Sequence, residues 1–271
     1  MSKGKYLLRR LGMGIFVIGG VLIITFLLAR VVPADPARLF VGARAKPEQL
    51  EAARVTLGLD KPLPMQFVDY VAGIAKGDLG ISFRSKRPIV DDLKIFLPAT
   101  LELVIPSILL AVIIGIPVGI YGAAKRGGKA DQIARVLTVG GVSMPAFWFA
   151  LILQLLFVTW LGWLPLGGRL SREIIISSPI EPAITGFYLI DSMLTGNWMA
   201  WWDALQHLIL PVVVLSTYPI ALISRMTRTS MVESLSQEYV TSARAAGLKQ
   251  RTILYKLALK NAILPTLTML G

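Results

Sequence analysis

Residues 103–124 read LVIPSILLAVIIGIPVGIYGAA and carry no charged side chain over 22 positions. A helix rises about 1.5 Å per residue, so roughly 20 apolar residues are needed to cross about 30 Å of hydrocarbon. This stretch meets that length. The whole chain of 271 residues is also strongly apolar, with 55% hydrophobic side chains and a mean hydropathy of +0.66. The sequence therefore predicts an all-α integral membrane protein.

Further uncharged stretches extend this prediction along the chain. Residues 11–29, 136–168 and 208–224 each lack charged side chains, and residues 261–271 begin a fifth apolar stretch. Because this last stretch is too short to cross a bilayer, we expect the natural chain to continue beyond a truncated C-terminus and to hold six spans. Prolines inside or at the ends of the spans predict a bundle of kinked helices: Pro106, Pro117, Pro145, Pro211, Pro219 and Pro265.

The basic side chains predict the orientation of the chain. The formal net charge is +12, and Lys and Arg are concentrated before residue 11, at 125–135 and at 225–260. Under the positive-inside rule these segments face the cytoplasm, which places the N-terminus inside. This placement explains the positive charge without a nucleic-acid partner. The first apolar stretch is longer than a usual signal-peptide core and lacks a clean small-x-small cleavage site, so we expect a resident helix.

Residues 33–98 lie on the outer side in this topology. Glycine and proline mark turns, and the residue pattern predicts short helices over residues 47–55 and 65–75. We therefore expect a small periplasmic cap of helices, with no disulfide because the chain has no cysteine. The predicted division is an N-terminal end and first span at 1–32, the cap at 33–98 and the main membrane domain at 99–271.

Residues 225–260 are the most informative basic segment because their pattern is helix, glycine, helix. Ser234 and Gln237 have the spacing of a capping box, and Gly247 lies where a helix would end in a left-handed residue. Residues of one predicted face recur at every fourth position: Met231, Leu235, Tyr239 and Ala243. A short amphipathic helix of this kind docks into a partner or lies in the membrane interface, and periodicity alone favours neither.

The same segment carries a resemblance to a known family. TSARAAG at 241–247, followed by LKNAILP at 259–265, resembles the cytoplasmic "EAA" loop of ABC importer permeases in its dipeptide, oligopeptide and nickel version. Other landmarks of that family resemble, in the right order, residues 57–62, 77–82, 99–103, 143–148 and 225–228. The chain is most similar to the B-type subunit of dipeptide permeases. The resemblance implies a type I importer bundle with a coupling loop at 225–260.

In that family the loop forms a coupling helix that inserts into a groove of a cytoplasmic ATPase subunit. The resemblance places this contact at residues 238–247. The ATPase-coupling residues that it implies are Glu238, Tyr239, Ala243, Arg244, Ala245 and Gly247. Thr241 stands where the broader motif has a glutamate, so the salt bridge of that glutamate is not implied unless Glu238 supplies it.

The resemblance also implies an activity and partners. It implies a permease that imports dipeptides or oligopeptides across the bacterial cytoplasmic membrane by alternating access, with nickel chelates or glutathione as alternative substrates. Its partners would be a second homologous permease, two ATPase subunits and a periplasmic binding protein that docks on residues 33–98 and 163–206. The sequence has no GxxxxGK[ST] phosphate loop, so the ATPase subunits would bind ATP and Mg. We expect no cofactor and no catalysis in this chain.

Two polar residues in the predicted spans are candidates for the translocation path. Glu102 could meet a peptide amino group, although a structural ion pair is the stronger expectation, and Gln154 could line the path or hydrogen-bond between helices. His207 is the only histidine, so we expect no metal site. A stand-alone channel or secondary transporter would show paired intramembrane charges or inverted halves, and a membrane enzyme HExxH, GxSxG or paired carboxylates. None of these patterns occurs in the predicted spans.

Overall fold

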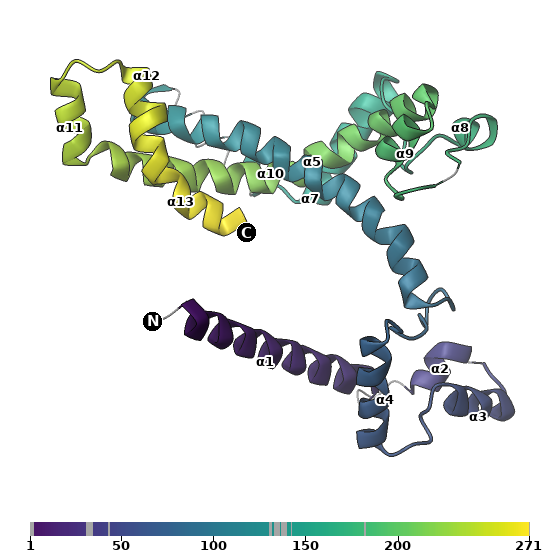
Figure 1. Ribbon diagram of the computed structural model, residues 1–271. Coiled ribbons are helices and arrows are strands. Elements are labelled where there is room, and N and C mark those ends of the chain that lie inside the picture. The colour runs from purple at the N-terminus through teal and green to yellow at the C-terminus, as the bar shows by residue number, and fades with distance from the viewer. Residues whose placement is uncertain are drawn as a thin grey trace. The chain divides into compact units, whose positions relative to one another are not determined.

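The computed structural model describes residues 3–30, 35–42, 44–129, 132, 136, 140–141, 143–181 and 183–270. Within these residues the regular structure is helical, and the one β-bridge is an isolated pair between Ile81 and Pro88. The all-α expectation is confirmed. The chain divides into two compact units, Met1–Phe96 and Leu97–Gly271. Figure 1 shows the helices of both units, which are described separately.

The described part of the first unit contains one long helix and three short ones: α1 (Lys3–Arg30), α2 (Pro36–Val41), α3 (Pro47–Thr56) and α4 (Leu63–Ala75). The short helices predicted over residues 47–55 and 65–75 are confirmed by α3 and α4. Aromatic contacts join α1 to α4, because Phe26 is buried with its ring centroid 5.2 Å from that of Phe67 and 5.9 Å from that of Tyr70. The Arg30 guanidinium also donates to the Leu57 carbonyl over 3.1 Å.

The second unit is built around two long helices. Helix α5 (Ile89–Ala124) begins in the first unit and continues into the second, and α10 (Trp198–Leu235) runs for 38 residues. The other elements in the described residues of this unit are, in chain order, α7 (Ala146–Gln154), the π-helix η1 (Leu155–Trp160), α8 (Arg172–Ser177), α9 (Tyr188–Leu194), α11 (Glu238–Ala245), α12 (Gln250–Thr252), the π-helix η2 (Ile253–Ala258) and α13 (Leu259–Leu270).

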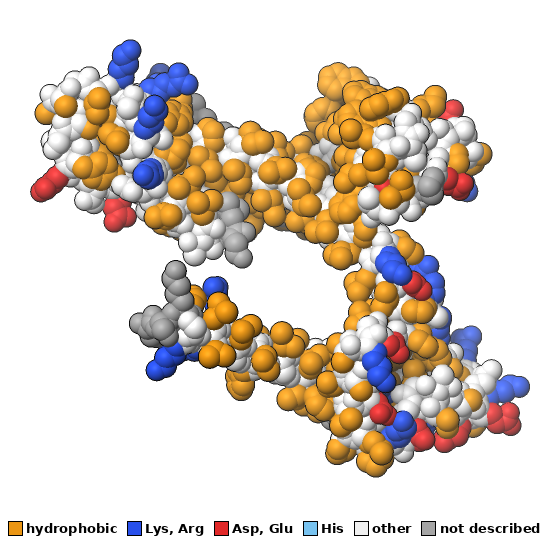
Figure 2. Space-filling model, viewed as in Figure 1, with side chains coloured by type: hydrophobic (Ala, Val, Ile, Leu, Met, Phe, Trp, Pro, Cys, Tyr) orange, Lys and Arg blue, Asp and Glu red, His pale blue; other side chains and the backbone are white. Residues whose placement is uncertain are grey.

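Among the described residues, three helices are long and apolar enough to cross a membrane: Gly4–Arg30, Ile89–Ala124 and Trp198–Leu235. They contain the predicted spans at 11–29, 103–124 and 208–224, and an 18-residue window in each has a mean hydropathy of 2.6, 2.7 and 1.8, respectively. The predicted span at 136–168 is described in part, as the shorter apolar helix Ala146–Trp160, because residues 137–139 and 142 and the neighbouring Arg135 lie outside the described residues. Figure 2 shows hydrophobic side chains covering much of the surface of these helices.

Small residues bring α5 and α10 into close contact. A Cβ atom added at Gly119 would lie 2.7 Å from both the Ser224 carbonyl oxygen and the Thr227 Cβ, and one added at Gly115 would lie 2.9 Å from the Ile223 Cγ2. Distances this short leave no room for a side chain, so glycine is required for the observed separation of the helices. One buried cluster then joins α5 and α10 to η2 and α13: Ile120, Ala123, Met231, Ala258 and Ala262.

Candidate functional site

The segment predicted to contact an ATPase forms a short, separate helix. Helix α10 ends at Leu235, Ser236 and Gln237 form the connection, and α11 begins at Glu238. The predicted capping box is wrong, because Gln237 is the N-cap of α11 and makes no side-chain capping bond. The predicted single face of Met231, Leu235, Tyr239 and Ala243 is also wrong, because the break at 236–237 assigns two of these residues to α10 and two to α11.

Helix α11 has one buried and one exposed side. Val240 and Ala243 are buried and pack with Ile253 of η2, supported by Leu235 and Leu257. Ala243 therefore fills an internal contact, and its direct contact with a partner stays a prediction. The other predicted coupling residues of the helix lie on its exposed side: Glu238, Tyr239, Arg244 and Ala245. Thr241 and Ser242 are exposed as well.

Gly247 ends this helix in the predicted left-handed conformation, with φ of +75°. Its N–H donates to the Arg244 carbonyl over 3.0 Å, and the Leu248 N–H donates to the Ala243 carbonyl over 3.1 Å. These two bonds form a Schellman motif, which satisfies carbonyls that the helix end leaves without partners. A side chain at Gly247 would be strained at this φ even though nothing lies within 4 Å of the added Cβ.

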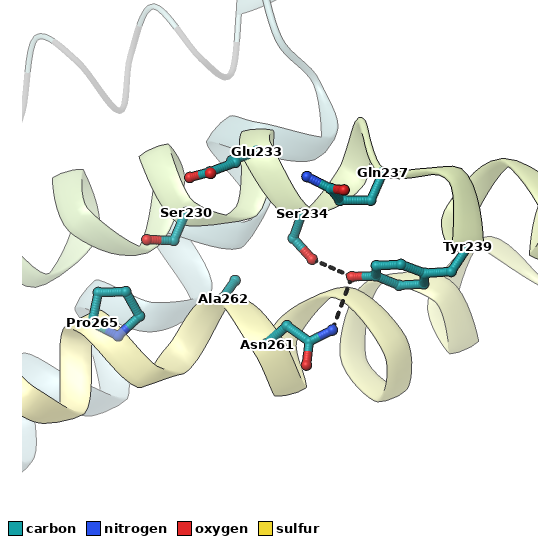
Figure 3. A pocket seen from close by; sticks show the side chains of 8 residues that line it. All are labelled: Ser230, Glu233, Ser234, Gln237, Tyr239, Asn261, Ala262 and Pro265. Atoms are coloured by element: carbon teal, nitrogen blue, oxygen red, sulfur yellow. Dashed lines mark hydrogen bonds between the residues drawn. The ribbon is translucent and has the colours of Figure 1, made fainter.

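A tyrosine hydroxyl connects α11 to two neighbouring elements. The Tyr239 hydroxyl lies 2.5 Å from the Ser234 Oγ of α10 and accepts a 3.2 Å hydrogen bond from the Asn261 Nδ2 of α13. The Ser234 hydroxyl also donates to the Ala258 carbonyl at the end of η2 over 3.0 Å. Figure 3 shows Ser234, Tyr239 and Asn261 converging beside an open pocket of about 380 Å³, whose rim includes Ser230, Glu233 and Gln237.

Glu102 lies at the other end of the second unit and is engaged in an ion pair. It is buried, with one carboxylate oxygen 2.6 Å from the Arg169 Nη2 and the other accepting from the Leu189 N–H over 2.8 Å. Arg169 also donates to the Gly186 carbonyl over 2.8 Å, and its guanidinium lies over the Tyr188 ring, 3.5 Å from the centroid. These contacts favour the structural ion pair over contact with a peptide, and a path-lining role for Glu102 stays a prediction.

Gln154 and His207 occupy less connected positions. Gln154 is the last residue of α7, directly before η1, and is half-buried, so its role in the path stays a prediction. His207 is buried in α10 with Nδ1 2.8 Å from the Asp203 carbonyl oxygen. Across the part of the chain that the structure describes, no three His, Cys, Asp or Glu side chains are grouped as a metal would require.

Two carboxylates with structural roles were missed from the sequence. Asp191 is fully buried and accepts hydrogen bonds from the Thr185 N–H and hydroxyl and from the Gly186 N–H, over 2.8, 2.6 and 2.9 Å. Asp203 accepts two bonds of 2.6 Å from the Ser171 N–H and hydroxyl. For Asp191 the available signal was the combination of Asp with Thr and Gly in a turn-rich segment, which favours side-chain bonds to nearby backbone. Asp203 bonds to a residue 32 positions away, so no local pattern predicted its role.

A mostly apolar cavity of about 720 Å³ lies between the start of α7 and the middle of α10. Its walls include Met144, Phe149, Val214, Thr217 and Tyr218. The cavity lies within the second unit and opens beside helices that can span a membrane.

Comparison with known proteins gives consistent matches over both units. The family model described as "Binding-protein-dependent transport system inner membrane component" matches residues 115–271, and the model for the N-terminal part of such membrane components matches residues 4–104.

Among the curated relatives, three illustrate matches over nearly the whole chain. A probable D,D-dipeptide transport system permease protein, DdpB of Escherichia coli K12, is 44% identical over 95% of this chain and 74% of its own length. A di/tripeptide permease, DppB of Pseudomonas aeruginosa, is 42% identical over 98% of this chain and 78% of its own. A glutathione permease, GsiC of Pectobacterium atrosepticum, is 35% identical over 93% and 71%.

Proposed function

Because this chain belongs to the family of binding-protein-dependent inner-membrane transport components, we propose that it forms one half of the path of an ATP-driven peptide importer. The chain is a permease subunit, a multi-pass membrane protein whose family transports rather than catalyses. Short peptides are the proposed substrates. This choice is supported by the relatives named for D,D-dipeptides, di- and tripeptides and glutathione, since glutathione is itself a tripeptide.

The proposed assembly contains a second homologous permease, two cytoplasmic ATPase subunits that bind ATP and Mg, and a periplasmic binding protein. The N-terminus lies in the cytoplasm, in agreement with the basic segments at 125–135 and 225–260. This topology puts α11 on the cytoplasmic side. It leaves residues 33–98 and 163–206 on the outer side, where the binding protein delivers the peptide.

We propose that alternating access is driven through α11. The observation that carries this proposal is a short helix with a polar exposed side, fixed on its other side by Val240, Ala243 and Ile253 and ended by the Gly247 motif. When two ATPase subunits close around ATP, they displace this helix, and the displacement reorients α10 and α13. The cavity between α7 and α10 is then alternately open to the two sides of the membrane.

The test is purification of the membrane complex in mild detergent after co-expression of this chain with candidate ATPase, permease and binding-protein subunits. We expect the ATPase subunits to co-purify, and a dipeptide with the binding protein to stimulate ATP hydrolysis. Purification of the chain without ATPase, under conditions that preserve its membrane insertion, would contradict the proposal.

Single substitutions locate the contact on α11. Arg244→Glu and Ala245→Glu change exposed residues of the helix, so we expect loss of the co-purified ATPase with normal amounts of inserted chain. Lys76→Glu reverses an exposed charge in the first unit and is the matched control. Gly247→Pro should also uncouple hydrolysis, because proline fixes φ near −65° and Gly247 has φ of +75°.

A further inference from the structure

We propose that the Tyr239 hydroxyl is the positioning group that transmits displacement of α11 to α10 and α13 together. This inference rests on the proposed function, because it assigns the mechanical link within a permease driven through α11. The Tyr239 hydroxyl forms hydrogen bonds with Ser234 of α10 and Asn261 of α13. No other described side chain of α11 forms hydrogen bonds with side chains of both helices.

The chemistry of the partners fixes the direction of this chain of hydrogen bonds. The Ala258 carbonyl can only accept, so Ser234 uses its single hydroxyl proton there. The Asn261 amide nitrogen can only donate, so its bond occupies a lone pair of the Tyr239 oxygen. The tyrosine proton is therefore free to be donated to the Ser234 oxygen. Each donor therefore has an acceptor: Asn261 donates to Tyr239, Tyr239 to Ser234, and Ser234 to the Ala258 carbonyl (Figure 3).

The other contacts of α11 with this region are of a different kind. Val240 and Ala243 pack against Ile253, and apolar contacts of this kind have no preferred direction. These contacts fix the position of α11, but, with a two-residue connection before the helix and a glycine turn after it, they restrain its rotation about its own axis less than directed bonds do. A hydrogen bond weakens steeply with angle. The Tyr239 bonds therefore set the orientation of α11, and its movement reaches both membrane helices.

The first test measures peptide-stimulated ATP hydrolysis relative to basal hydrolysis in the purified complex. Tyr239→Phe removes only the hydroxyl, and we expect this ratio to fall about fivefold, the size of effect that one neutral hydrogen bond gives. Tyr255→Phe removes the hydroxyl of a half-exposed tyrosine in η2 and is the matched control, with an unchanged ratio.

Two conservative variants separate positioning from packing. Asn261→Asp keeps the shape of the side chain but replaces the donor by an acceptor, which reverses the direction of its bond with Tyr239, so we expect the ratio to fall. Ser234→Ala should lower the ratio and Ser234→Thr, which keeps a hydroxyl, should restore most of it. If Asn261→Asp and Ser234→Ala both keep the normal ratio, the directed chain of bonds has no role.

The second test measures the link itself. The chain has no cysteine, so spin labels can be placed at Ser242→Cys on α11 and Thr229→Cys on α10 without background from this subunit. Both positions are exposed. In the assembled complex we expect Tyr239→Phe to broaden the distance distribution between the labels, and Tyr255→Phe to leave it unchanged.

The outcomes distinguish this inference from the proposed function. If ATPase subunits fail to co-purify with the unsubstituted chain, the proposed function is contradicted. If they co-purify and Tyr239→Phe keeps either its normal stimulation ratio or its normal distance distribution, the inference about Tyr239 is overturned and the assignment of the permease stands.

Discussion

The two ends of α10 are held by different chemistry. At its N-terminal end, the Asn197 side chain caps the helix by accepting from the Ala200 N–H, and Asp203 accepts two bonds from Ser171. The Glu102–Arg169 ion pair ties α5 to the same region. At its C-terminal end, Thr227 and Ser234 make neutral hydroxyl bonds to α13 and η2. Carboxylates therefore hold the N-terminal end of α10, and neutral hydroxyl groups hold its C-terminal end.

This difference assigns a mechanical role to each end. Charge-assisted hydrogen bonds are roughly twice as strong as neutral ones, and removing one partner leaves a charge that is costly to bury. The end around Asp203 and Arg169 is therefore suited to remain fixed. Hydrogen bonds between neutral hydroxyl groups cost less free energy to break and re-form with other partners, so the end beside α11 is suited to rearrangement. Four substitutions, in order of decreasing effect, test this contrast.

The largest effect is expected for Glu102→Ala. This change removes the anion from Arg169 and the acceptor from the Leu189 N–H, so we expect a loss of about 4 kcal/mol in the free energy of unfolding. Thermal unfolding of the purified chain in detergent measures it. Glu102→Gln retains an acceptor and should lose less. An unfolding temperature that does not change in Glu102→Ala would remove the basis for calling this end fixed.

Asp191→Ala is expected to have the second largest effect, a loss of about 3 kcal/mol in the free energy of unfolding at neutral pH. The substitution leaves the donors on Thr185 and Gly186 without their acceptor. Burial raises the pKa of Asp191, but the hydrogen bonds from Thr185, Gly186 and Ile184 outweigh it and lower the pKa below 3.8.

A carboxyl with a lowered pKa stabilises the fold above its unfolded pKa, and this stabilisation is lost as the pH falls through the folded pKa. The difference in unfolding temperature between Asp191→Ala and the unsubstituted chain should therefore be full at neutral pH and shrink below about 3.8. A difference that grows with acid would contradict the role given to Asp191.

Gly119→Ala tests the close contact of α5 and α10. The added methyl group would lie 2.7 Å from Ser224 and Thr227 atoms, so we expect a loss of about 2 kcal/mol from overpacking. Gly19→Ala is the matched control, because nothing lies within 4 Å of a Cβ there and alanine favours helix by about 1 kcal/mol. Equal changes in the unfolding temperature of both variants would show that the contact is not tight.

Thr266→Val is expected to have the smallest effect. It removes the 3.3 Å bond between the buried hydroxyls of Thr227 and Thr266 and keeps the shape of the side chain, so we expect about 1 kcal/mol. Thermal unfolding measures this loss. The control is Thr268→Val, which removes only an exposed bond within the same helix, to the Leu264 carbonyl. A loss as large as that of Glu102→Ala would mean that the two ends do not differ in the proposed way.

The membrane-spanning helices were predictable from the sequence because their signal is local. Uncharged stretches of sufficient length gave the spans within α1, α5 and α10, and spacing gave α3 and α4. Gly247 was also predictable, since a helix followed by glycine commonly ends in a left-handed residue. Each of these features depends on residues within one continuous stretch of the chain.

The contacts between distant segments were not predictable in the same way. Arg169 lies 67 positions from Glu102, and Asn261 lies 22 positions from Tyr239, so spacing contains no signal for either pair. The predicted capping box at Ser234 failed for a related reason. A serine near a helix boundary has several acceptors within reach, and here the tertiary contact with η2 and Tyr239 replaced the local cap.

The π-helix η2 has a consequence for how this permease tolerates changes in chain length. It places Ile253–Ala258 in a wider turn directly before α13. Such a turn holds about one residue more than an α-helical turn, and each α-helical residue advances the helix by roughly 100°. Deleting a single residue from this turn would restore ordinary α-helical winding, whereas deleting one within α13 would shift the rotational phase of all that follows. Length variation is therefore best absorbed in η2, ahead of Asn261 and Thr266.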